Sequence, residues 1–382
     1  MLDAHHLDAV RPYACLSTAF DEPAWRDEAE RSNAEPIPRA LVLRIETSGD
    51  IERLLREIEL VAPHFDRDRD VVAVHVEAAV VPSPARLGAL LGSLERHFHF
   101  APAGRAARSL GVGARRVRHG DFAAFAALGF VQVKFASGPR DLDSALRGIA
   151  AAREQGVHRT GLEASLPASA DRAGGPDLDA MIDAQPEQLA LRLAEAPDGA
   201  APIDTLATLA TALHAGGYRD IGLDTRPLAW LEEGPYRIAG VTGPGPTPVP
   251  GQEVDLIGFG PGARMRIGDA VCENLADPDA WSAAIDAGRL PLWRGLTLDT
   301  EARLRTDVVG QWLRNGEIDI EAVERRYGIV FGEYFADALG RLEPCAREGL
   351  VSHMPSYVRA TSRGRLMLRI MARCFDPPDP HR

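Results

Sequence analysis

The stretch LVLRIETSGDIERLLREIELV, residues 41–61, contains a strand, a turn and a helix in immediate succession. Residues 41–47 are short, apolar and rich in leucine, and they end before Ser48 and Gly49, which is typical of a β-strand. Between residues 50 and 61 the apolar side chains recur at intervals of three and four, which indicates an amphipathic helix. The stretch therefore predicts one βα unit in which the strand runs almost directly into its helix.

The same alternation continues on both sides of this unit, from about residue 40 to residue 265. Short apolar segments bounded by Gly, Pro or Asp predict further strands at 71–81, 108–112, 129–135, 161–166, 189–194, 220–223 and 255–259. Helical spacing recurs at 84–98 and 142–155. Repeated βα units predict an α/β fold with a parallel sheet and outer helices. A partial barrel suits the number of units, with a doubly wound open sheet as the alternative, and either fold places ligands at the carboxyl ends of the strands.

The chain after about residue 277 has a different pattern. Helical segments are predicted at 278–287, 300–312, 320–327 and 332–342, followed by a small β-ribbon at 350–360 and a last helix at 363–373. We therefore divide the chain into an N-terminal arm (1–39), a barrel (40–265) and a mainly helical C-terminal domain (266–382).

Composition excludes several classes of function. The 382 residues carry a formal net charge of −12, which argues against a general nucleic-acid binder because no excess of cations is available for phosphates. No apolar run is long enough to span a bilayer. The N-terminus lacks the cationic start and apolar run of a secretory signal. The four cysteines, at positions 15, 272, 345 and 374, are few and scattered, so we expect a cytoplasmic protein.

Two segments near residue 250 are rich in glycine. GVTGPGPTPVPG, 240–251, predicts an ordered surface excursion or a lid. VDLIGFGPGARM, 254–265, has glycines at 258, 260 and 262, but it lacks the context and the third spaced glycine of a phosphate-binding loop. Close approach of two backbones is the better explanation of these glycines.

Several segments resemble one family. VDLIGFGPGARM (254–265), LPLWRGLTL (290–298), YGIVFGEYFADALGRLEPCAREGLV (327–351) and TSRGRLMLRIMARCFD (361–376) resemble the C-terminal part of oxygen-independent coproporphyrinogen III oxidase, a radical S-adenosylmethionine (SAM) enzyme of haem biosynthesis. RPYACLSTAF (11–20) is similar to the N-terminal arm of that family. The resemblance implies a partial (βα)6 barrel followed by a helical domain.

The resemblance also implies a cofactor site that this sequence does not reproduce. In the family a C-x-x-x-C-x-x-C loop after the first strand binds a [4Fe–4S] cluster, which binds and cleaves SAM. Here the corresponding place is near Ser48 and contains no cysteine, and a hydroxyl does not replace a thiolate ligand. The family's glycine-rich segment after the second strand is EAAVVPS (77–83), and its polar residues after later strands align near Gly111, Ala136 and Glu163. We expect neither a cluster nor SAM, and no working radical SAM oxidase.

The candidate ligand-binding residues are Arg44, Lys134, Glu163 and Asp224, with no catalytic or metal-binding residue assigned. Lys134 lies near a strand end, where a desolvated lysine can form a Schiff base, although a salt bridge is the simpler interpretation. Glu163 and Asp224 suit acid–base chemistry at the barrel mouth, or else they cap helices or pair with arginines such as Arg44. Arg44 is the barrel residue expected to meet the propionate of an acidic tetrapyrrole.

Other polar residues have plainer interpretations. His75, on a predicted strand, is expected to be a hydrogen-bonded core histidine rather than a haem or metal ligand. His97 and His99 lie at a helix end and are expected to be solvated. Cys374 is expected to be a small buried apolar residue rather than a haem ligand.

These observations leave three hypotheses open. The first is a porphyrin- or haem-related binding or accessory protein without radical chemistry. The second is an interaction protein that pairs with an active homologue or another pathway enzyme, or with a second copy of itself. The third is an enzyme with new, cofactor-independent chemistry. In each case we expect a reduced open cleft at the strand ends, partly filled by Val80 and Val81 and bordered by Arg44, Glu163 and Asp224.

Overall fold

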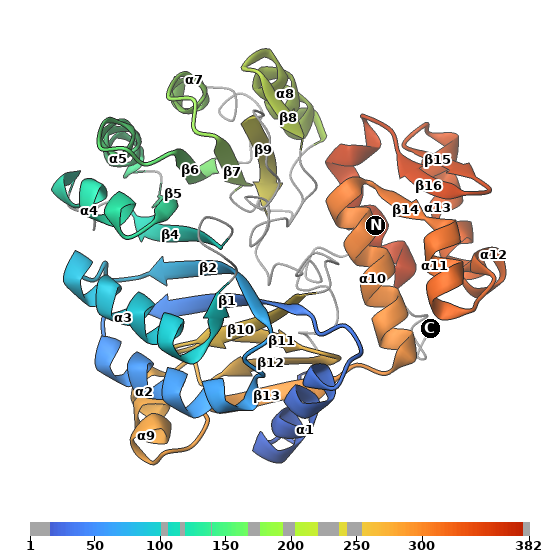
Figure 1. The fold of residues 1–382 in the computed structure, drawn as a ribbon. Helices are drawn as coiled ribbons and strands as arrows, with labels where there is room; N and C mark the ends of the chain where they lie inside the picture. The colour runs from blue at the N-terminus through green and yellow to red at the C-terminus, as the bar shows by residue number, and fades with distance from the viewer. Residues whose placement is uncertain are drawn as a thin grey trace.

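A computed structural model describes residues 16–100, 106–114, 119–138, 140–166, 176–193, 203–220, 237–242 and 254–376. Its main feature is a large curved sheet with helices along its outer side (Figure 1). The strands of this sheet are β1 (Ala40–Thr47), β2 (Asp70–Ala78), β3 (His99–Phe100), β4 (Ala107–Gly113), β5 (Phe130–Ser137), β6 (Arg159–Leu166), β7 (Gln188–Leu193), β8 (Tyr218–Asp220), β9 (Arg237–Thr242), β10 (Val254–Phe259), β11 (Arg264–Ile267), β12 (Ala270–Asn274) and β13 (Leu292–Thr297).

The strand order identifies a partial barrel. Neighbouring strands follow the order β13-β12-β11-β10-β1-β2-β4-β5-β6-β7-β9-β8, and every pair from β10 to β8 is parallel. From β1 to β7 the order follows the chain in one direction, so the reversal that defines a doubly wound sheet does not occur there. The α/β barrel prediction is confirmed, and the doubly wound alternative is wrong.

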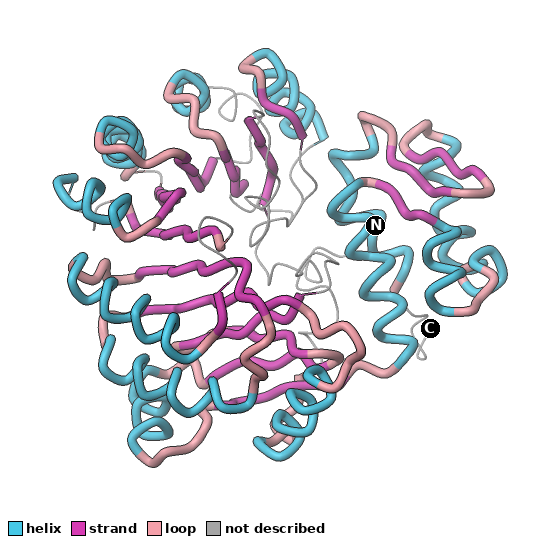
Figure 2. The backbone as a smooth tube through the Cα atoms, in the orientation of Figure 1, coloured by secondary structure: helices cyan, strands magenta, loops and turns pink. Residues whose placement is uncertain are grey.

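The helices between the strands pack on the convex side of the sheet (Figure 2). They are α2 (Ile51–Val61), α3 (Pro84–His97), α4 (Phe122–Ala127), α5 (Leu142–Glu154), α7 (Pro176–Asp183) and α8 (Ile203–Ala215). The helix α1 (Glu22–Asn33) precedes the first strand, and α9 (Pro278–Asp286) lies between β12 and β13. The Asp50 carboxylate caps α2 by accepting from Arg53 N at 3.1 Å.

The two faces of β1 differ in chemistry. Leu41, Leu43 and Ile45 point outward into the main core, where they pack with the apolar faces of the helices. Val42 points inward and belongs to a small apolar cluster at the bottom of the barrel. The next inward residues of the strand are Arg44 and Glu46, because inward positions alternate along a strand. The interior is therefore apolar at the bottom and charged toward the carboxyl ends of the strands.

A second, smaller unit follows the sheet. It contains α10 (Thr300–Asn315), α11 (Ile320–Tyr327), α12 (Phe331–Tyr334), α13 (Ala336–Arg347), α14 (Leu368–Ala372) and a sheet of order β14-β16-β15 formed by β14 (Glu317–Asp319), β15 (Val351–Met354) and β16 (Tyr357–Ala360). Its core extends from Leu304 to Phe375 and is separate from the barrel core. The predicted boundary at 265/266 lies inside β11, and the main sheet continues to the end of β13 at Thr297.

Candidate functional site

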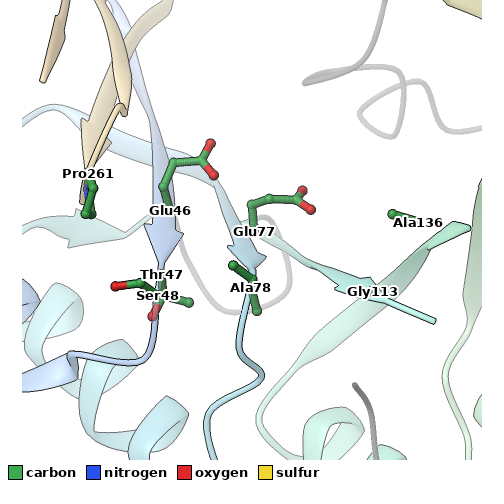
Figure 3. A pocket seen from close by; sticks show the side chains of 9 residues that line it. Glu46, Thr47, Ser48, Glu77, Ala78, Gly113, Ala136 and Pro261 are labelled. Carbon is green, nitrogen blue, oxygen red and sulfur yellow. The ribbon is translucent and has the colours of Figure 1, made fainter. Parts of the chain in front are cut away.

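A cleft of about 460 Å³ opens at the carboxyl ends of the barrel strands (Figure 3). Its lining residues come from β1, β2, β4, β5 and the turn after β10, and they are Glu46, Thr47, Ser48, Glu77, Ala78, Ala79, Gly113, Ala136 and Pro261. Strand ends of a barrel are where ligand chemistry is normally placed. The location of the cleft agrees with the prediction, whereas its lining does not, because Arg44, Glu163, Val80 and Val81 are not among the lining residues.

Two polar rows cross the inner surface of the barrel directly below and within the cleft. The lower row follows the register Arg44–His75–Ser109–Gln132 across β1, β2, β4 and β5. The upper row follows Glu46–Glu77–Gly111–Lys134 across the same strands. Parallel pairing aligns these residues because each strand contributes every second side chain to the inner face.

Glu46 and Arg44 form an ion pair along β1. Arg44 Nε donates to Glu46 Oε1 at 2.6 Å, and both side chains are partly exposed. Burial raises the pKa of Glu46 above its ordinary value, and the neighbouring charge of Glu77 adds to this, although Arg44 opposes it. Glu46 therefore holds a proton more readily than an exposed glutamate does.

Glu77 and His75 make the corresponding contact along β2. His75 Nε2 lies 3.1 Å from Glu77 Oε2, and His75 Nδ1 lies 2.7 Å from Ser109 Oγ. Burial lowers the pKa of His75 to about 4, so its ring is neutral at pH 7. Burial acts to raise the pKa of Glu77, but the hydrogen bond from His75 and the positive charges of Arg44 and Lys134 outweigh it and lower this pKa.

The protonation states fix the direction of both hydrogen bonds. An ionised Glu77 only accepts, so His75 Nε2 carries the proton and donates it. The unprotonated Nδ1 then accepts from the hydroxyl of Ser109. Ser109 is fully buried, so it orients the imidazole and is not available to a ligand. His75 is the hydrogen-bonded core histidine that the sequence predicted.

Glycine at position 111 provides the space that Glu77 occupies. A Cβ atom at Gly111 would lie 2.3 Å from Glu77 Oε2, which is far inside van der Waals contact. Glu77 therefore leans over β4, and the cleft side of that strand is covered by a carboxylate from its neighbour. A side chain at position 111 would displace Glu77 from this place.

The wall of the cleft beside β10 depends on close backbone contact. Gly260 has φ +100°, and a Cβ atom there would lie 1.9 Å from the carbonyl oxygen of Glu46. Behind this turn, the buried carboxyl of Glu57 accepts from Gly260 N at 2.7 Å, Asn274 Nδ2 at 2.7 Å and Trp281 Nε1 at 3.2 Å. The predicted close backbone approach is confirmed at Gly260 and at Gly258, where a Cβ atom would lie 2.4 Å from Arg264 O, whereas at Gly262 the nearest contact is an ordinary 3.6 Å. The same contacts hold Pro261 at the edge of the cleft.

The connection between β1 and α2 does not fit an iron–sulfur cluster. It consists of Ser48, Gly49 and Asp50, and it is closed by the bond from Gly49 N to Thr47 Oγ1 at 3.0 Å. Among the described cysteines, Cys272 is buried within the sheet, where burial raises its pKa. The other two, Cys345 and Cys374, pack against the second core. Thiolates are the ligands such a cluster requires, and none of these positions adjoins the cleft.

The remaining predicted residues have mixed outcomes. Lys134 lies in the upper polar row on β5, close enough to act on the charges of His75 and Glu77. Glu163 pairs in register with Ala136 on β5, one row higher. Asp224 lies outside the described residues. Cys374 is half-buried rather than buried, and desolvation raises its pKa to about 11, which disfavours the reactive thiolate.

The helix-end histidines differ slightly from the prediction. His97 is the last residue of α3, whereas His99 belongs to the short strand β3 and lies 2.9 Å from Asp70. Both remain outside the cleft. No group of three or more His, Cys, Asp or Glu residues within the described part of the chain is arranged to hold a metal ion.

Comparison with known proteins confirms the resemblance. No family model matches the chain. It is 33% identical over 197 residues to the oxygen-independent coproporphyrinogen III oxidase of Salmonella typhimurium, a match that covers 50% of this chain and 42% of that enzyme. It is 26% identical over 368 residues to the enzyme of the same name from Pseudomonas aeruginosa, covering 85% and 78%. The match to the first of these relatives thus spans less than half of its length.

The solved structure of coproporphyrinogen III oxidase (HemN) from Escherichia coli, described as a radical SAM enzyme, superposes with a TM-score of 0.78. The identity is 22%, and the superposition covers 95% of both chains. The fold is therefore the partial barrel of radical SAM proteins with a helical C-terminal domain. Together with the sequence matches, this makes the chain similar in sequence and in fold to oxygen-independent coproporphyrinogen III oxidases of the HemN type. Within the part of the chain that is described, no helix is long and apolar enough to cross a membrane.

Proposed function

We propose that this chain is a member of the family that works without an iron–sulfur cluster and without SAM, and that it binds a ligand in the cleft at the strand ends. The observation that carries this proposal is the three-residue connection Ser48–Asp50. It contains no thiol, and it is closed by its own hydrogen bonds and by the cap of α2. A tight turn of this kind leaves no loop on which cluster ligands can converge.

The residues that occupy the cleft at β2 and β4 support the same proposal. The space over β4 contains the Glu77 carboxylate, and Gly111 provides no side chain of its own. The lining residues at the end of β2 and directly after it are alanines, Ala78 and Ala79. The volume of about 460 Å³ falls within the range of small-molecule sites in proteins.

Anaerobic reconstitution with iron and sulfide tests the loss of the cluster. We expect no stoichiometric iron, no acid-labile sulfide and no reductive cleavage of SAM. A reconstituted protein with about four irons per chain and SAM-cleaving activity would overturn the proposal.

The ligand class suggested by the family relationship is a tetrapyrrole, so the protein would act as a porphyrin- or haem-related binding or accessory protein. Arg44 is the barrel cation predicted to meet a propionate, and its guanidinium already pairs with Glu46 at 2.6 Å. An acidic tetrapyrrole must therefore compete with this pair.

Titration of coproporphyrin and haemin against wild type, Arg44→Ala and the outer-surface control Arg86→Ala tests this ligand class. We expect binding that only Arg44→Ala weakens, by about tenfold for one lost charge-assisted contact. Equal affinity in all three proteins, or no binding, removes the tetrapyrrole from this site.

A second candidate function is cofactor-independent acid–base catalysis. Glu46 and Glu77 lie side by side in register, and their surroundings move their pKa values in opposite directions, up for Glu46 and down for Glu77. Such a separation is the arrangement of a general acid beside a general base. Incubation of wild type and Glu77→Gln with a metabolite extract tests it. A compound consumed by wild type alone supports catalysis, and identical profiles contradict it.

A further inference from the structure

We infer that the cleft binds the protonated amine of a small organic cation between the carboxylates of Glu46 and Glu77. This inference rests on the proposed function in one respect, namely that the cleft is a ligand site without a cluster. It adds the chemical class of the group that the site recognises.

The same device orients both carboxylates. On β1, Arg44 Nε donates to Glu46 Oε1 at 2.6 Å, and on β2, His75 Nε2 donates to Glu77 Oε2 at 3.1 Å. In each strand the donor lies two residues before its glutamate, so it holds one carboxylate oxygen from below. The second oxygens, Glu46 Oε2 and Glu77 Oε1, accept no hydrogen bond from any described residue. Figure 3 shows both side chains projecting from adjacent strands toward the same side.

The ionisable groups that the described residues contribute to the cleft surface have one sign. Among the described lining residues only Glu46 and Glu77 are ionisable, and the others are alanines, a glycine, a proline and two hydroxyl residues. The two nearby cations, Arg44 and Lys134, are not lining residues, and Arg44 is already paired with Glu46. Within the described lining, a ligand in the cleft therefore meets carboxylate oxygens and no cation. An anion would be repelled there, whereas an ammonium group would be attracted.

A buried amide gives an independent indication of the same chemistry. Gln132 is 2% exposed and lies on the same face of β5 as Ala136, which lines the cleft. Its Nε2 donates to Gln188 Oε1 at 3.2 Å, but its Oε1 has no partner in the described structure. Buried polar atoms without a partner are rare. On the far side of β4 from Glu77 and one row lower, the barrel interior thus has a further acceptor without a donor among the described residues.

An ammonium group can donate hydrogen bonds to these unpaired acceptors because it carries three donors and no acceptor. A divalent metal ion fits these acceptors less well, because the described residues form no group of three or more metal-binding side chains. The alanines beside the carboxylates suit an apolar body attached to the amine. The expected ligand is therefore a primary amine on a small apolar frame.

Three probes of matched size separate charge from shape: benzylamine, benzyl alcohol and benzoate. Isothermal titration at pH 7 measures their binding to wild type, Glu46→Gln, Glu77→Gln and Glu59→Gln. The last variant is the control, since Glu59 is exposed on the outer helix α2. We expect wild type to prefer benzylamine over benzyl alcohol by at least about tenfold, with benzoate weakest. Each cleft variant should lose about tenfold in benzylamine affinity, and the control should lose none.

Several outcomes overturn the inference. They are no binding of benzylamine at millimolar concentration, equal affinity for benzylamine and benzyl alcohol, or unchanged affinity in both cleft variants. Circular dichroism and the melting temperature show whether each variant is folded. If Glu77→Gln does not fold, the benzylamine affinity of Glu46→Gln alone tests the inference. If coproporphyrin binds but benzylamine does not, the proposed function stands and this inference falls. If reconstitution gives a cluster, the proposed function falls first.

Discussion

Replacing Asp255 by alanine should destabilise the barrel more than any single surface change. Asp255 is fully buried on β10 and accepts from Arg69 Nη2 at 2.6 Å, from Gly268 N at 2.9 Å and from the Ser32 hydroxyl. The Arg69 side chain is also fully buried, so the substitution leaves a guanidinium without its counter-ion. Removing one partner of a buried pair costs about 3–5 kcal/mol. Arg69 keeps bonds to Arg39 O and Asn33 Oδ1, which places the loss within this range rather than above it.

Urea unfolding followed by circular dichroism and tryptophan fluorescence measures this loss. The matched control is Arg26→Ala, which breaks an exposed ion pair on α1 and should change the free energy of unfolding by about 0–1 kcal/mol. Adding Arg69→Met to Asp255→Ala should cost less than the sum of the two single changes, because the unpaired charge disappears with the arginine. A loss below about 1 kcal/mol for Asp255→Ala, or fully additive losses, would refute the reasoning.

Three further predictions follow from the same structure. Burial raises the pKa of Glu57 to about 8, so between about pH 5 and 8 the folded state binds more protons than the unfolded state. The free energy of unfolding should therefore fall as the pH rises through this window. Glu57→Gln should flatten this fall, measured as urea midpoints against pH, and an unchanged slope would contradict the assignment. Gly260→Ala places a Cβ atom 1.9 Å from a carbonyl oxygen and should prevent soluble expression or lower the melting temperature steeply. In the control Gly288→Ala, φ is +68° and no atom lies within 4 Å of the new Cβ, so the free energy of unfolding should fall by only about 1–2 kcal/mol. Similar melting temperatures for the two variants would contradict this prediction. A chain ending at residue 275 lacks β13 and α9 and should be insoluble, whereas a chain ending at residue 299, between the two cores, should stay folded. Gel filtration distinguishes these outcomes. Equal solubility of the two truncated chains would refute the domain description.

Local periodicity was enough to predict most of the barrel. The unit at 41–61 is observed as β1 and α2, because its two periods are strong and its turn residues are unambiguous. The helix α1 was missed because the segment Glu22–Asn33 was assigned to the N-terminal arm, although Asp21 and Pro23 are typical helix-start residues. The predicted helix at 332–342 is observed as two helices, α12 and α13, since Phe331 and Phe335 both turn into the second core.

The candidate site was harder to predict because it depends on register. The signals for Glu46 and Glu77 were present in the alternation of LRIET and VHVEA, where a basic or polar residue precedes a glutamate by two positions. Which glutamate faces the cleft follows only when strands are aligned, and the alignment of Glu46 with Glu77 across β1 and β2 involves residues about thirty apart in the chain. Lys134 and Glu163 were chosen for their positions near strand ends, but the cleft begins at β1 and β2.

The cost of the two carboxylates is the strongest reason to regard the cleft as functional. Glu46 and Glu77 lie opposite each other on neighbouring strands, where like charges repel, and burial penalises both. Arg44 and His75 offset part of this penalty, but apolar residues at all four positions would remove it entirely and would extend the apolar floor formed by Val42 and its neighbours. Stability alone therefore does not explain the charged residues in the two polar rows of the barrel. A ligand that supplies donors to the two free carboxylate oxygens would reduce the remaining penalty, and this is the contribution that the amine titrations measure.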